Sequence, residues 1–215
     1  MRFSDLAAAG RGLAEELRPF RGREDVIVLA LVRGGVPAAN EIARELDLSL
    51  DLVLRRTAVH VGPMHIAAAV NVAGTLVLDE EVQAVLDGPE TPNRLNVIDL
   101  LASLEARVQT CRGDRAPVSI AGKTVILVDN GVRTGDTIQS AVRAIRTLSP
   151  ARIVLALGAA SQESREMLHT IADEVVCLRW PEGVFGNVAL WYQRFDVPTE
   201  ETIGALFEEI QRVAV

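Results

Sequence analysis

This 215-residue sequence contains few aromatic residues (4%), three histidines, two cysteines and a single lysine, Lys123. The cysteines, Cys111 and Cys177, stand far apart and outside any metal-ligand spacing, which argues against a zinc site and indicates buried thiols in a reducing compartment. No apolar run approaches the roughly 20 residues of a membrane-spanning helix. The first residues, MRFSDLAAAG, also lack the basic and long apolar parts of a signal peptide. We therefore expect a cytoplasmic protein that does not enter a membrane.

The sequence is rich in apolar residues (49%) and contains 24% charged residues, which is the composition of a globular protein with an ample core. The length suits a single domain over residues 1–215. The net charge of -7 argues against a broad nucleic-acid-binding surface. A local anion site remains open, because it needs only a few oriented hydrogen-bond donors.

Short apolar runs of strand length alternate with segments of helix length. We expect strands at residues 26–31, 50–54, 125–128, 152–157 and 174–178. We expect helices at residues 6–20 (capped by Ser4 or Asp5), 36–46, 92–112, 136–148 and 161–171. Residues 57–90 predict a loop followed by an irregular hairpin. Continuous apolar strands separated by helices predict an α/β fold, with a doubly wound, mostly parallel sheet of about five strands flanked by helices.

The segment VILVDNGVRTGDT, residues 125–137, places charged and small polar residues directly after a buried strand. Ligands of doubly wound folds bind at the carboxyl ends of strands, near the point where the strand order reverses. Two glycines allow tight turns, and the N–H groups that follow, with the hydroxyls of Thr134 and Thr137, could cradle a phosphate. An acid before this cradle, Asp129, suits a sugar diol, so the combination predicts a ribose 5-phosphate site. The alternative is a plain strand–turn–helix, with residues 129–131 as the turn and Thr134 as the N-cap.

This segment resembles the 5-phosphoribosyl-1-pyrophosphate (PRPP) motif of the type I phosphoribosyltransferases, a hydrophobic strand followed by two acids and a glycine- and threonine-rich loop that opens a helix. By this resemblance, Asp129 binds the ribose hydroxyls. Asn130 replaces the second acid, and Arg133 stands where purine-salvage members carry a catalytic aspartate. Asp136 fits the phosphate loop only if its side chain points away. The residues implied in binding ribose 5-phosphate are Asp129, Asn130, Gly131, Arg133, Thr134, Gly135, Asp136 and Thr137.

A second segment, LALVRGGVP at residues 29–37, supports the resemblance. In the family this is the pyrophosphate loop, which presents backbone N–H groups and a basic residue to the diphosphate, often beside a non-proline cis peptide bond. Taken alone, the segment could equally be a glycine turn before a helix. Arg55 and Arg56 end the second strand, where related proteins have cations that can neutralise the departing diphosphate. The residues implied in binding diphosphate are Arg33, Gly34, Gly35 and Arg56.

Residues 179–203 contain both tryptophans and the single tyrosine. They resemble the hood of the family, and especially the tail of a little-characterised bacterial branch. Together with the N-terminal segment they would form a small hood. Trp180 and Phe185 could stack on a nucleobase or simply pack the hood onto the sheet. For Trp191 and Tyr192 we expect packing.

The resemblance implies that PRPP binds with Mg²⁺ and that its ribose 5-phosphate is transferred to a nitrogenous small-molecule acceptor, with release of diphosphate. This is the reaction of a pentosyltransferase, and homodimers are common in the family. His60 and His65, in the loop after Arg56, could shuttle a proton, although an exposed loop histidine more often has no such role. The segment LALGAASQ around Gly158 lacks the lysine with which hypoxanthine–guanine enzymes read the purine oxygen. A 6-oxopurine substrate is therefore not expected.

Two other functions differ in kind from this one. A non-catalytic PRPP- or nucleotide-sensing protein of the same fold is favoured by Asn130 and Arg133, and it would bind PRPP without releasing diphosphate. A Rossmann-type dinucleotide enzyme is excluded, because RGGVP lacks the G-x-G-x-x-G spacing.

Overall fold

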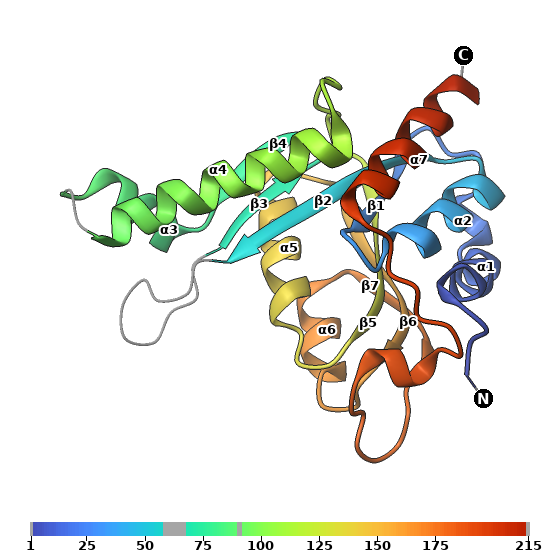
Figure 1. Ribbon diagram of the computed structural model, residues 1–215. Coiled ribbons are helices and arrows are strands. Elements are labelled where there is room, and N and C mark those ends of the chain that lie inside the picture. Colours follow the sequence, from blue (N-terminus) through green and yellow to red (C-terminus); the bar gives the residue numbers. More distant parts are fainter. Residues whose placement is uncertain (1, 58–67, 90–91, 214–215) are drawn as a thin grey trace.

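The computed structural model describes residues 2–57, 68–89 and 92–213, and within them it forms one seven-stranded sheet with helices on both faces (Figure 1). The strand order is β4-β3-β2-β1-β5-β6-β7. Neighbouring strands from β2 to β7 in this order are parallel, whereas β3 runs antiparallel to β2 and β4 antiparallel to β3. The predicted α/β fold with a mostly parallel sheet is confirmed. The strands are β1 (Val26–Leu31), β2 (Ser49–Thr57), β3 (Ala68–Val72), β4 (Thr75–Leu78), β5 (Thr124–Val132), β6 (Arg152–Ala160) and β7 (Glu174–Arg179).

The sheet exceeds the predicted five or so strands because the hairpin expected within residues 57–90 joins its edge. β3 pairs with β2, so that Val70 stands opposite Arg55. The hairpin turns at Ala73 and Gly74, which both have positive φ (49° and 92°), a conformation that glycine adopts without steric cost. The loop predicted before the hairpin falls on residues 58–67, outside the described residues.

Hydrogen bonds of small polar side chains set two helix boundaries. Asp5 is the N-cap of the first helix, because its Oδ1 accepts the N–H of Ala8 at 2.8 Å. α6 begins later than the predicted residue 161, because the Ser161 and Ser164 hydroxyls bond neighbouring backbone groups in a turn before it. The helices are α1 (Leu6–Glu16), α2 (Val36–Leu46), α3 (Glu80–Asp87), α4 (Pro92–Arg112), α5 (Asp136–Thr147), α6 (Arg165–Ile171) and α7 (Glu200–Val213), with 3-10 turns η1 (Arg18–Phe20) and η2 (Val188–Trp191).

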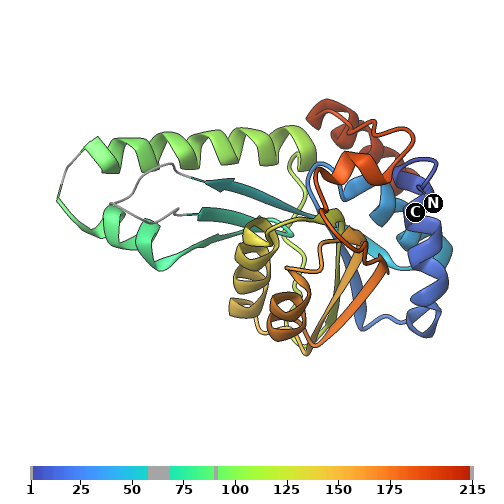
Figure 2. The ribbon, with the colours of Figure 1, turned by 90° about the horizontal axis from the view of Figure 1, so that it is seen from below.

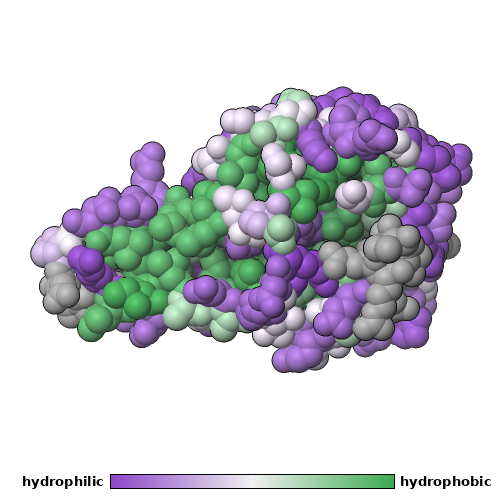
Figure 3. Space-filling model, turned by 90° about the horizontal axis from the view of Figure 1, so that it is seen from above, coloured by the Kyte–Doolittle hydropathy of each residue, from purple (hydrophilic) through white to green (hydrophobic). Residues whose placement is uncertain are grey.

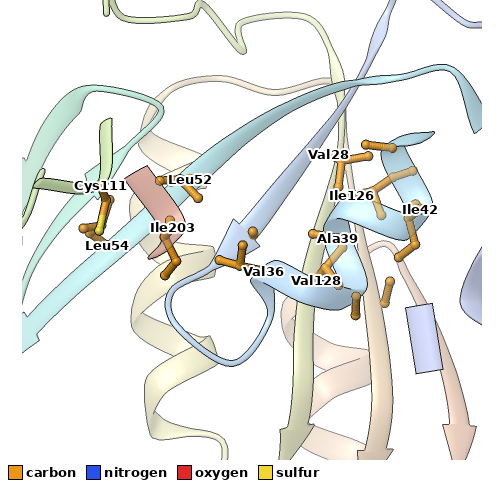
Figure 4. Packing of buried hydrophobic residues seen from close by; sticks show 14 of the residues in the cluster. Val28, Val36, Ala39, Ile42, Leu52, Leu54, Cys111, Ile126, Val128 and Ile203 are labelled. Atoms are coloured by element: carbon orange, nitrogen blue, oxygen red, sulfur yellow. The ribbon is translucent and has the colours of Figure 1, made fainter. Parts of the chain in front are cut away.

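The central strands are buried on both faces, which explains their unbroken apolar sequence. Side chains of successive strand residues point to opposite faces. Val28 of β1 thus lies in the core cluster on one side, beside Ile42 of α2 (Figure 4), and Leu29 lies in the cluster that contains the α5 residues on the other. Each fully buried aliphatic side chain of this kind stabilises the fold by about 1.5–3 kcal/mol.

β3, β4, α3 and α4 form an arm that projects from the rest of the molecule (Figure 2). Val97 and Leu104 of α4 are buried in the core cluster, whereas Leu95 and Ile98 are 65% and 47% exposed. Figure 3 shows hydrophobic surface over this arm. α4 is therefore apolar on more than one side.

None of the helices in the described ranges is long and apolar enough to cross a membrane.

The direction of the chain through the sheet reverses at the two adjacent strands β1 and β5. From β1 the chain moves outward through α2 to β2, whereas β5, β6 and β7 follow one another on the other side of β1. The pair is in register, with Ala30 opposite Val128. The carboxyl ends of β1 and β5 are thus the position at which a doubly wound sheet binds its ligand.

Candidate functional site

The two glycine-containing segments predicted to form a site lie side by side at this position. The segment after β1 contains a cis peptide bond between Val32 and Arg33, as the resemblance implied. α2 begins immediately afterwards, with Gly35 at its N-cap. The segment after β5 leads to α5, whose N-cap is Gly135 with φ 93°. Two helix N-termini, each with unpaired N–H groups, therefore start next to the same edge of the sheet.

The segments touch through Gly34 and Asn130. A Cβ on Gly34 would overlap the side-chain amide of Asn130, with Cγ only 2.7 Å away. A Cβ on Gly35 would overlap the carbonyl oxygen of Val128 and lie 2.8 Å from that of Leu31. Both glycines are needed because their backbone lies against the end of β5, and the alternative of an independent glycine turn does not account for this contact.

Asp129 lies within β5, not in a turn. The strand continues to residue 132, because Gly131 and Val132 still pair with Ala159 and Ala160 of β6. The predicted strand end at residue 128 and the alternative turn at residues 129–131 are therefore wrong. The alternative N-cap role of Thr134 is also wrong, since Gly135 is the N-cap.

The Asp129 carboxylate is poorly solvated and has no ion-pair partner among the described residues. Burial raises its pKa to about 7, and the N–H of Asn130, which donates to Oδ1 at 2.8 Å, partly opposes this shift. The residue as a whole is nevertheless partly exposed to solvent. A desolvated carboxylate with unused acceptor positions suits a ligand that brings hydroxyl groups or a cation.

The loop between β5 and α5 exposes its polar side chains. Arg133, Thr134, Asp136 and Thr137 are exposed, and the Thr134 hydroxyl donates to Oδ2 of Asp136 at 3.0 Å. A phosphate in this loop would take over the Thr134 hydroxyl and would require the Asp136 side chain to turn away. The backbone of the loop is anchored, because the Ser161 hydroxyl donates to the Arg133 carbonyl at 2.6 Å.

The adjacent arginines at the end of β2 lie on different faces of the strand. Arg56 is exposed, whereas Arg55 is half-buried and its Nε has no hydrogen-bond partner. Burial lowers the pKa of Arg55, and the charges of Asp136 and Asp79 oppose that shift. Arg55 thus lies near the start of α5. The two-residue strand repeat could have shown this, because Arg55 shares a face with Val53, which packs on the α5 side.

The two aromatic residues predicted for base stacking are engaged with the protein. The guanidinium of Arg165 lies 5.0 Å from the Trp180 ring centre, and His169 stacks on the same ring at 6.3 Å. Phe185 is 6% exposed and stacks on Trp191 at 5.7 Å. Their role toward a base stays a prediction.

The remaining predicted residues differ in whether the structure describes them. His60 and His65 lie outside the described residues. Arg33 is exposed beside the cis peptide bond. Tyr192, for which the sequence predicted only packing, also donates a hydrogen bond to the carbonyl oxygen of Asn130 at 2.5 Å. No short-range sequence signal could have revealed this bond, because the two residues are 62 positions apart.

The described residues contain no group of three or more histidine, cysteine or acidic side chains that could hold a metal by itself. Mg²⁺ usually keeps several waters and binds through one or two carboxylates together with substrate phosphates. The residues at this strand end fit an ion of that kind, for which Asp129 would offer a carboxylate beside the phosphates of a ligand.

A doubly wound sheet with two glycine loops and a desolvated acid at its reversal point is the arrangement that the resemblance to the phosphoribosyltransferases implied. The family model described as "Phosphoribosyl transferase domain" matches residues 3–189, and the chain belongs to this family.

Individual relatives agree with this assignment. Two proteins of Mycobacterium tuberculosis, from strains CDC 1551 and H37Rv and provisionally named phosphoribosyl transferases, are each 31% identical over 98% of this chain. The chain spans about half (47%) of their length. The crystal structure of TT1426 from Thermus thermophilus is similar with a TM-score of 0.79 and 35% identity, over 97% of this chain and 99% of that one.

Proposed function

We propose that the protein binds PRPP together with Mg²⁺ and transfers ribose 5-phosphate to a nitrogenous acceptor, with release of diphosphate. The observation that carries this proposal is the contact between Gly34 and Asn130, which joins the loop expected for diphosphate to the strand end expected for ribose. In PRPP the diphosphate and the ribose are also covalently adjacent. A site for two unrelated anions would not need its two loops to touch.

In this proposal the ribose and its 5-phosphate occupy the end of β5. The carboxylate of Asp129 accepts hydrogen bonds from the two ribose hydroxyls, which replace the water that its surroundings exclude. The 5-phosphate lies at the N-terminus of α5, where residues 134–137 offer N–H groups and the helix dipole favours an anion.

The diphosphate lies between the β1 loop and the end of β2. The N–H groups that open α2 and the side chains of Arg33 and Arg56 would face it, whereas the half-buried Arg55 lies on the α5 side, toward the 5-phosphate. Mg²⁺, when bound, would offset the charge of the diphosphate and ribose oxygens. As the C1–O bond breaks, its electron pair leaves with the diphosphate, and the acceptor nitrogen forms the new C–N bond. No described residue is assigned as a general base, so the acceptor nitrogen would already be unprotonated.

One observation favours the alternative of a PRPP- or nucleotide-sensing protein without catalysis. The side chain of Asn130, which replaces the second acid of the motif, packs against Gly34. It is therefore occupied within the protein, and the ribose would be held by one carboxylate instead of two. Such a site could bind PRPP while activating it poorly.

Calorimetric titration of PRPP with and without Mg²⁺ tests the proposal. Asp129→Ala is the variant. Asp173→Ala is the acidic control, because Asp173 directly precedes β7 and so lies at the opposite end of the strands from the candidate site. We expect binding that requires Mg²⁺ and that weakens by about 1–3 kcal/mol in Asp129→Ala only. Unchanged affinity in Asp129→Ala would refute the ribose assignment. Diphosphate release with a panel of nitrogenous bases then separates an enzyme from a sensor.

A further inference from the structure

Tyr192 connects the C-terminal region of the chain to the candidate site. It follows η2, is 3% exposed, and its ring lies between Phe3 at 5.4 Å and Phe195 at 5.3 Å. From this aromatic cluster its hydroxyl reaches the end of the sheet and donates to the carbonyl oxygen of Asn130 at 2.5 Å. Burial, together with the nearby charge of Asp129, raises the pKa of Tyr192, so the hydroxyl remains a donor at neutral pH.

The sheet leaves space for this hydroxyl at Gly158. Asn130 and Gly158 face each other across β5 and β6, since the flanking pairs are Asp129 with Leu157 and Gly131 with Ala159. A Cβ at Gly158 would overlap the Tyr192 oxygen and lie 2.7 Å from the Asn130 carbonyl oxygen. Glycine at this position is therefore needed for the bond between Tyr192 and Asn130.

Asn130 is the residue through which such a bond acts on the site. Its N–H donates to the Asp129 carboxylate, and its side chain lies against Gly34 of the diphosphate loop. Fixing the carbonyl of Asn130 thus restrains the orientation of the carboxylate on one side and of the glycine loop on the other. A binding group works only when supporting hydrogen bonds and packing hold it close to its productive geometry.

The N-terminal residues hold Tyr192 in place. The N–H of Phe3 donates to the Trp191 carbonyl at 2.9 Å, and the N–H of Gln193 donates to the Phe3 carbonyl at 2.8 Å. Arg194 and Asp5 form an ion pair at 2.7 Å. These bonds flank Tyr192 on both sides, so its position is set by the packing of the two chain regions against each other.

We propose that Tyr192 is a positioning residue for ribose binding, which acts by holding Asn130 and through it the Asp129 carboxylate. This inference rests on the proposed function. It differs from a packing role, which needs the ring and not the hydroxyl. The substitution Tyr192→Phe removes only the hydroxyl and keeps the aromatic cluster.

The matched control is Trp191→Phe, which also removes one hydrogen-bond donor from the same segment. Trp191 Nε1 donates to the carbonyl of Phe185 at 3.3 Å and does not contact Asn130. Ribose 5-phosphate and inorganic phosphate serve as separate probes in NMR titrations of wild type and both variants. Ribose 5-phosphate needs the diol contact, whereas inorganic phosphate needs only the loop at residues 134–137.

For Tyr192→Phe we expect binding of ribose 5-phosphate about 2- to 10-fold weaker, the effect of one neutral hydrogen bond, with unchanged binding of inorganic phosphate. Trp191→Phe should match wild type with both probes. Equal affinity of Tyr192→Phe and wild type for ribose 5-phosphate would overturn the inference, and so would equal weakening of both probes, which indicates a general structural effect. If wild type binds phosphate but not ribose 5-phosphate, the proposed function fails first, and the inference falls with it.

Discussion

The side chain of Asn130 packs against the α-carbon of Gly34, although the two residues lie almost 100 positions apart in the sequence. Asn130 belongs to the β5 strand end that carries the acid, and Gly34 to the loop that carries the cis peptide bond. The contact joins the two sequence motifs into one site, so a substitution in either motif should alter the conformation of the other.

Gly34→Ala should disturb the site by steric overlap. Its Cβ would displace the Asn130 amide, and overpacking of this kind typically costs about 1–3 kcal/mol. We expect a lower free energy of unfolding in urea and weaker PRPP binding. In the double variant Gly34→Ala/Asn130→Ala the added methyl group gains space, so both properties should recover toward those of Asn130→Ala alone. A double variant that is as impaired as Gly34→Ala would contradict the contact.

The titration of Asp129 should make stability depend on pH. Its pKa is raised from 3.8 to about 7 in the folded protein, so between these values the folded state holds a proton that the unfolded chain has lost. The contribution of Asp129 to the free energy of unfolding is therefore greatest below about pH 4 and declines as the pH rises to about 7. The measurement is the free energy of unfolding of wild type minus that of Asp129→Asn at pH 5, 6, 7 and 8. This difference should fall with rising pH and then level off; a difference independent of pH would show that Asp129 is not desolvated.

Arg55→Met should separate ligand binding from stability. The Arg55 Nε is buried without a hydrogen-bond partner, and burial opposes its charge, so the unliganded protein loses little when it is removed. A phosphate at the start of α5 would bring a negative charge close to this guanidinium. We expect a melting temperature equal to or above that of wild type and PRPP binding weaker by about 1.5–3 kcal/mol, the range for hydrogen bonds to charged groups.

Arg56→Met is the comparison for Arg55→Met, because Arg56 is exposed on the same strand end. Its loss should weaken PRPP binding less, since solvent screens its charge. A larger effect of Arg56→Met than of Arg55→Met would contradict this order and would favour Arg56, the residue that the sequence predicted to bind diphosphate.

Arg112→Met should destabilise the protein strongly, because it leaves the Asp51 carboxylate buried without its cation. The two side chains are 3% and 4% exposed and form two hydrogen bonds of 3.0 and 2.8 Å. Breaking a buried pair costs about 3–5 kcal/mol in unfolding free energy. The surface pair of Arg152 and Glu174 provides the control, since Arg152→Met should cost less than about 1 kcal/mol. Similar losses in the two variants, measured by urea denaturation, would argue against this difference in burial.

The sequence alone determined the elements that depend on local pattern. Unbroken apolar runs such as residues 26–31 predicted strands buried on both faces, because a strand covered by helices on both sides has no polar face. The motif after β5 and the glycines after β1 predicted where a ligand would bind, since the carboxyl ends of parallel strands meet at one edge. Residue types and their spacing were sufficient for these conclusions.

The tertiary structure decided what depends on contacts between distant segments. It continued β5 through residue 132 by pairing with β6, added the β3–β4 hairpin to the sheet, and placed Arg55 on the α5 face of the sheet. The bond from Tyr192 to Asn130, and the need for glycine at position 158, arise only when the C-terminal segment packs against the end of the sheet. Side-chain periodicity specifies which way a residue points within its own element, whereas the partner that it meets is set by how the elements pack together.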